Sequence, residues 1–145
     1  MYLTVQEYID RAYQDETERL ANENEVLDGT IDQTENTIIE MCIKDASELI
    51  DSHLRGRYTL PLSVDIPELL KRDCFVITKK YLFSKKNLWN DLVEEDFKDV
   101  KKHLDRIAKG MTKLDIPILS GEKSNGQITF TTGKQLFSKD ALRGF

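Results

Sequence analysis

Few residues of this chain have the types and spacing that catalysis or metal binding requires. The two histidines, His53 and His103, are not accompanied by a pattern of serine or cysteine typical of a nucleophile and its base. Carboxylates are many, but none of their spacings resembles a metal site or an acid–base pair. The run 132–134 (TGK) lacks the upstream glycine of a phosphate-binding loop. The sequence therefore predicts neither an enzyme nor a metal or cofactor site.

The cysteines and histidines are better explained as structural residues. Cys42 and Cys74 fall on the apolar stripes of expected helices, where a free cysteine behaves as a small core residue. A disulfide is not expected in a reducing compartment. His53 is expected at the end of a helix, where a polar or cationic tip is favourable, and His103 at the edge of the core.

Composition indicates one small, mostly helical domain. The chain has 145 residues, of which 39% are hydrophobic and 32% charged. No apolar run approaches the roughly 20 residues that span a bilayer. The N-terminus lacks the basic and apolar regions of a signal peptide, so we expect the protein to stay in the cytoplasm in which it is made.

Hydrophobic periodicity predicts four helices, at about 4–22, 32–54, 66–83 and 89–109. The third is apolar on the widest arc and is therefore expected at the centre of the core, with neighbours on two sides. The expected capping boxes are Thr4 with Glu7 and Asp32 with Glu35, and the expected glycine stops are Gly56, in the left-handed conformation, and Gly110.

The last part of the chain differs in character. We expect a helical domain over 1–117 and a tail over 118–145, with an extended strand at 127–132. A solitary strand is not stable in water, and the apolar residues of the tail favour pairing with another surface. The predicted fold class is all-α: a small bundle of four helices, or five with short turns, with an extended, partly flexible C-terminal tail.

Charge is distributed unevenly. Residues 1–51 carry a balance of −11 and residues 52–145 one of +6, within a net charge of −5. This pattern has two interpretations, solvated helix faces or a molecule with unlike ends suited to head-to-tail rings. Basic residues surround the third helix: Lys71, Arg72, Lys79, Lys80, Lys85 and Lys86. They fit either a nucleic-acid footprint or the positive partner of the acidic half.

Three runs carry a resemblance to a family: 28–32 (DGTID), 46–62 (ASELIDSHLRGRYTLPL) and 66–72 (IPELLKR). In their order and spacing they resemble the small Mu-like phage and prophage proteins of the head–tail connector kind. The resemblance covers about residues 4–117 and extends weakly into 142–145.

The resemblance implies a structural virion protein that joins head to tail. Related connectors form rings, usually of twelve subunits, beneath the portal, where they meet the portal protein and tail-side connector proteins. The protein would reside in the virion, and in the host bacterial cytoplasm during assembly. No cofactor is implied. An acidic N-terminal half facing the channel would let DNA pass without specific binding.

Interface residues are expected in two places. Arg55, Arg57 and Tyr58 lie in the link after the second helix, although this link could equally turn the chain and plug the bundle. The tail contributes the second set: Phe130, Phe137, Leu142 and Phe145. The alternative function is a cytoplasmic, phage-encoded regulatory or DNA-associated helical module.

Overall fold

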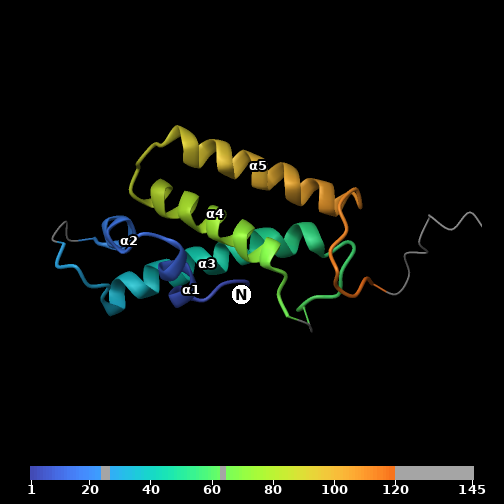
Figure 1. The fold of residues 1–145 in the computed structure, drawn as a ribbon, viewed down its shortest axis with the longest axis horizontal. Coiled ribbons are helices and arrows are strands. Elements are labelled where there is room, and N and C mark those ends of the chain that lie inside the picture. Colours follow the sequence, from blue (N-terminus) through green and yellow to red (C-terminus); the bar gives the residue numbers. More distant parts are fainter. Residues whose placement is uncertain (24–26, 63–64, 120–145) are drawn as a thin grey trace, which may run out of the picture.

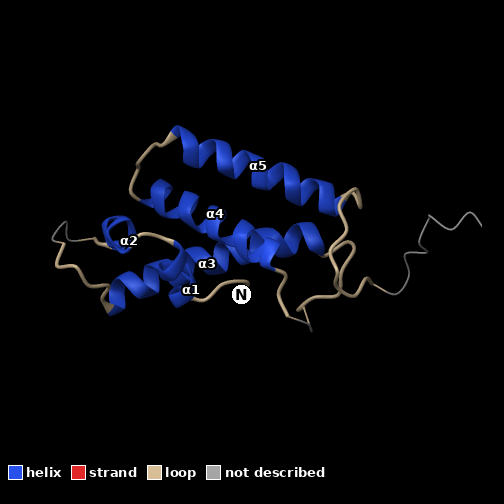
Figure 2. Ribbon diagram, viewed as in Figure 1, coloured by secondary structure: helices blue, strands red, loops and turns tan. Residues whose placement is uncertain are grey.

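A computed structural model describes residues 1–23, 27–62 and 65–119. The described chain is all-helical, as the sequence predicts, and Figures 1 and 2 show its arrangement. Its helices are α1 (Val5–Arg11), α2 (Gln14–Ala21), α3 (Gln33–Leu54), α4 (Glu68–Lys85) and α5 (Asp91–Ala108). None of these described helices is long and apolar enough to cross a membrane.

The three long helices, α3, α4 and α5, pack against one another around the core. Helix α4 has α3 and α5 as neighbours on two sides, as predicted. The centre of the core is nevertheless α3, because α3 contacts each of the other four helices. The buried stripes follow the predicted period, with Ile43 and Ile50 of α3 packing in one cluster with Ile77 of α4 and Leu104 of α5. Cys42 and Cys74 are free and buried, as expected.

Two leucines of the predicted helices 66–83 and 89–109, which hydrophobic periodicity places on the core-facing side, lie outside the core. Leu69 is 40% exposed and Leu92 is 64% exposed. Each lies in the first turn of its helix, α4 and α5 respectively, at an end of the bundle. Leu92 therefore belongs to the surface of the corner between α4 and α5.

The expected first helix over 4–22 is wrong in one respect, because the chain breaks at Ala12 and Tyr13. Both adopt extended backbone angles and separate α1 from α2. A continuous helix with Tyr8 inward would also turn the charged Asp15 and Arg19 inward and carry Ala21 outward. The break resets the phase, so that Leu20 and Ala21 are buried.

Helix ends follow the predicted signals with one exception. Both capping boxes form, at Thr4 and at Asp32. Gly110 stops α5 in the left-handed conformation, with φ +73°. Gly56 does not adopt that conformation, because the helical turn continues through Arg55 and the chain closes with hydrogen bonds from the amides of residues 57 and 58 to the carbonyl of residue 54.

The expected strand at 127–132 and the tail residues Phe130, Phe137, Leu142 and Phe145 lie outside the described residues. The boundary between 117 and 118 likewise stays a prediction.

Candidate interface

The link after α3 holds the end of the described chain in place. Tyr58 is only 3% exposed, and its hydroxyl accepts a hydrogen bond from the backbone N–H of Leu114 at 3.0 Å. Tyr58 also pairs with Ile118 in an isolated antiparallel bridge. The amide of Leu119 donates to the carbonyl of Arg57 at 3.0 Å. The link therefore fixes the place at which the described chain ends.

A glycine allows Arg57 to pack closely against the turn after α5. The guanidinium lies so near Gly110 that a β-carbon there would fall 2.5 Å from a terminal nitrogen of Arg57. A glycine is therefore needed at position 110 for two reasons: its backbone has a positive φ, and a side chain there would collide with Arg57. The contact joins the two connecting segments at one end of the molecule.

The three link residues predicted as interface have different surroundings. Tyr58 is buried and acts within the fold, Arg57 is half-buried against Gly110, and Arg55 is exposed. Of the three, Arg55 offers the most accessible side chain to a partner. Their interface role stays a prediction, as does that of the tail residues.

Acidic side chains of the N-terminal helices face the basic side of α4. Glu7 pairs with Lys71 at 2.6 Å and Glu16 with Lys79 at 2.9 Å. In the opposite sense, Arg11 of α1 pairs with Glu68 of α4 at 2.5 Å.

Two further lysines of α4 also have partners within the chain. Lys80 pairs with Glu94 of α5, and the ammonium of Lys86 donates to the carbonyl of Asn22. Much of the charge difference between the two parts of the sequence is therefore neutralised by contacts within one copy. Four of the six basic residues considered as a DNA footprint hold intramolecular partners.

A buried carboxylate pairs with a histidine between α4 and α5. Oδ2 of Asp73 lies 2.7 Å from Nδ1 of His103, and Asp73 is only 4% exposed. Burial raises the pKa of Asp73, an effect that His103 partly offsets. His103 thus lies at the edge of the core, as expected, with a partner that sequence reasoning missed.

The sequence does indicate that Asp73 needs a partner, although not which residue provides it. Asp73 stands three residues after Leu70 and four before Ile77, on the stripe of α4 that is otherwise apolar. A carboxylate at such a position needs a partner when buried. Within the described ranges no cluster of three potential ligands could hold a metal ion.

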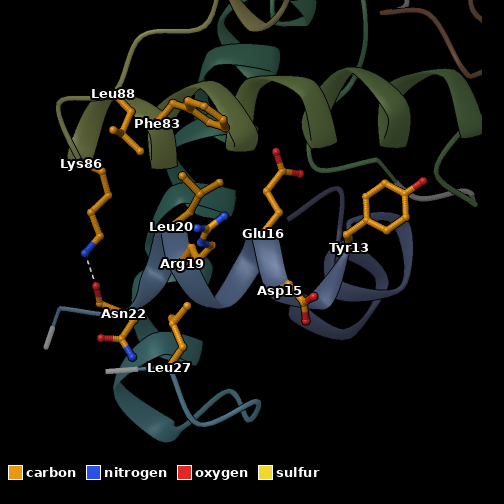
Figure 3. Close-up of a pocket in the computed structure, with 10 residues that line it drawn as sticks. All are labelled: Tyr13, Asp15, Glu16, Arg19, Leu20, Asn22, Leu27, Phe83, Lys86 and Leu88. Atoms are coloured by element: carbon orange, nitrogen blue, oxygen red, sulfur yellow. Dashed lines mark hydrogen bonds between the residues drawn. The ribbon is translucent and has the colours of Figure 1, made fainter. Parts of the chain in front are cut away.

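The other pronounced surface feature is an apolar groove of about 760 Å³ between α2 and the end of α4 (Figure 3). Phe83 and Leu88 extend toward Leu20 of α2. Leu27 and Tyr13 complete its apolar lining, and Tyr13 is 84% exposed. We call this feature the α2–α4 groove.

Beside the α2–α4 groove lies the corner between α4 and α5. Trp89, the chain's one tryptophan, is 72% exposed there, and Leu92 is exposed as well. The indole N–H donates to Asp91 at 2.7 Å, and the ammonium of Lys80 lies 5.5 Å from the ring centroid. Sequence patterns missed this surface because they assigned Trp89 and Leu92 to the start of a core-facing helix.

Comparisons with known proteins match most of the chain. A family model described as Bacteriophage Mu, Gp36 matches residues 2–131. The chain is 31% identical over 109 residues to the Mu-like prophage FluMu protein gp36 of Haemophilus influenzae, which covers 74% of each chain. It is 32% identical over 80 residues to gene product J of Escherichia phage Mu, which covers 55% of each.

Proposed function

Because the chain belongs to the Bacteriophage Mu, Gp36 family of Mu-like phage proteins, we propose that it is a structural protein of the virion. Its role is that of a head–tail connector, which forms a ring beneath the portal and joins the head to the tail. Its partners are the portal protein, tail-side connector proteins and further copies of itself. Twelve copies per ring is the number that the resemblance to other connectors suggests.

The observation that carries this proposal is the exposed apolar corner between α4 and α5. Trp89 and Leu92 are 72% and 64% exposed, beside the α2–α4 groove. Exposed apolar patches of this kind mark protein-interaction sites, and tryptophan is enriched among residues that dominate binding energy. A small helical body with such a surface suits repeated packing in an assembly.

Charge supports passage of DNA rather than its capture. DNA affinity depends on free basic side chains that neutralise phosphates. In this chain Lys71 and Lys79 pair with glutamates of α1 and α2, and the net charge is −5. In a ring whose N-terminal half faces the channel, DNA would pass without specific binding. The protein would be made in the host cytoplasm and end in the virion.

Binding to the portal tests the proposal. Purified protein is offered portal rings of its own phage in one experiment and duplex DNA over a range of salt in another. The proposal expects binding to portal and no salt-dependent DNA affinity. Steeply salt-dependent DNA binding without portal binding would favour the DNA-associated module instead.

Removal of residues 120–145 tests the role of the C-terminal segment. The helices described here do not include that segment, so the shortened protein should keep its helical signal. It should no longer bind the portal. Full affinity in the shortened protein would exclude a docking role for the segment.

A further inference from the structure

We propose that the α2–α4 groove receives the C-terminal segment, residues 120–145, of a neighbouring copy. The inference rests on the ring proposed above and adds the contact that would hold adjacent subunits together. It depends on the apolar lining of the groove, on the apolar composition and length of the segment, and on the place where the described chain ends.

The α2–α4 groove is lined for an apolar, aromatic ligand. Phe83 is half-buried in it, and Leu88 and Leu27 are 51% and 48% exposed on its walls. Tyr13, which is 84% exposed, lies at one end of the groove. Aromatic side chains that insert among such residues exclude water from both surfaces, and this is the usual basis of strong contact points in interfaces.

Residues 120–145 have the complementary composition. Six large apolar residues are spread along this segment: Ile128, Phe130, Leu136, Phe137, Leu142 and Phe145. Its charged side chains are four basic and two acidic, a balance of +2. The charged side chains that line the groove balance to zero: Asp15 and Glu16 are acidic, and Arg19 and Lys86 are basic. The groove and the segment are therefore complementary through their apolar side chains, not through net charge.

The geometry favours a head-to-tail contact between copies. The described chain ends beside the link after α3, where the amide of Leu119 bonds to Arg57. The groove lies at the opposite end of the bundle, beside the link between α4 and α5 (Figure 1). A donor site at one end and an acceptor site at the other make a heterologous contact, which closes into a ring when the rotation permits.

The segment is long enough for this contact. Helix α5 has 18 residues, so the bundle measures about 27 Å along that helix. The 26 residues beyond Leu119 reach at most about 90 Å when extended. The same reach would allow the segment to fill the groove of its own copy. The experiment must therefore distinguish the segment of the same copy from that of a neighbouring copy.

Photocrosslinking of the full chain makes that separation. A benzophenone side chain is placed at Leu88. Subunits of natural isotope composition (light) are mixed at high concentration with subunits labelled with nitrogen-15 (heavy), with and without portal rings. Mass spectrometry then identifies the crosslinked peptides, and sedimentation of the same samples reports assembly. A benzophenone at Met41, which is 53% exposed on α3 against 51% for Leu88, is the matched control.

The inference expects crosslinks from Leu88 to peptides within 120–145, in mixed light and heavy pairs, and few such crosslinks from Met41. Crosslinks only within one copy would place the segment in its own groove and overturn the inference. Assembly without any crosslink between Leu88 and the segment would overturn it while leaving the ring intact. Absence of both assembly and mixed crosslinks would contradict the ring and the inference together.

A charge substitution gives an independent measure. Leu88→Glu should lower the yield of association between copies by about tenfold, since it places a carboxylate in the apolar contact. Met41→Glu, at similar exposure, should leave association unchanged. Equal behaviour of the two variants, with helical signals like that of the unaltered protein, would count against the groove as the docking site.

Discussion

The hydroxyl of Tyr58 accepts a hydrogen bond from the amide of Leu114, and this contact joins the link after α3 to the segment that follows α5. The two residues are 56 positions apart in the chain. Ile118, which pairs with Tyr58, and Leu119, which bonds to Arg57, continue the same junction. The position of residues 114–119 against the link is thus a property of the fold.

Loss of that hydroxyl should destabilise the protein. Tyr58→Phe leaves the buried N–H of Leu114 without its acceptor, at a cost of about 1–3 kcal/mol in the free energy of unfolding. Denaturant unfolding measures the change. Tyr13→Phe is the control, because Tyr13 is 84% exposed. Equal stability of both variants would show that the hydrogen bond contributes nothing.

Gly110→Ala tests the close approach of Arg57. The positive φ alone should cost about 1–2 kcal/mol, and displacement of the guanidinium should add to that cost. Gly29→Ala is the matched control, since Gly29 has φ +80° but no heavy atom within 4 Å of the added β-carbon. Thermal unfolding should therefore show the larger loss for Gly110→Ala. An equal loss would mean that the Arg57 contact carries no stability.

Sequence reasoning succeeded where one local signal decided the structure. The capping boxes at Thr4 and Asp32 and the stop at Gly110 depend on neighbours within a single turn, and all three were predicted. The predicted left-handed stop at Gly56 was wrong because a glycine permits that conformation without requiring it. There the hydrogen bonds after residue 54 keep the chain in a helical turn.

The errors of the sequence analysis arose where tertiary packing decides. The break at Tyr13 depends on which face of α2 meets α3 and α4, and an imperfect stripe cannot show this. The groove beside Leu88 and the pairing of Asp73 with His103 join residues from different helices. Composition and periodicity describe one helix at a time, so such sites emerge only in the folded chain.

Acid should weaken the contact between α1 and α4. The hydrogen bond from Lys71, together with that from the Thr4 amide, lowers the pKa of Glu7 from 4.5 to about 2. A carboxyl with a lowered folded-state pKa stabilises the fold above its unfolded value and loses that effect as pH falls through the folded value. Unfolding of the protein and of Glu7→Gln should differ by about 0.2–1 kcal/mol above pH 4.5. This difference should vanish toward pH 2.

Lys71→Met provides the matching variant, because it removes the same ion pair from the α4 side. It should reduce the acid-dependent loss of stability much as Glu7→Gln does. A pH-independent difference between the protein and Glu7→Gln would contradict the assigned contact.

His103→Leu should expose the cost of burying Asp73. Without the imidazole, the carboxylate loses its partner at 2.7 Å, and the free energy of unfolding at neutral pH should fall by about 1–3 kcal/mol or more. Burial already raises the pKa of Asp73, and loss of His103, which lowers that pKa, should raise it further. The variant should therefore recover stability as pH falls and Asp73 takes up a proton.

His103→Gln is the control, since an amide can still donate to the carboxylate. It should retain more of the stability than His103→Leu. If both variants unfold like the unaltered protein at neutral pH, the pair does not contribute to the fold.

The mass of the complex between this protein and the portal tests the connector role most directly. Full-length protein in excess is mixed with portal rings of its own phage, and sedimentation reports the mass of the product. The account predicts one discrete complex with many copies bound to each portal ring. Protein that sediments as a monomer beside unaltered portal rings would contradict it.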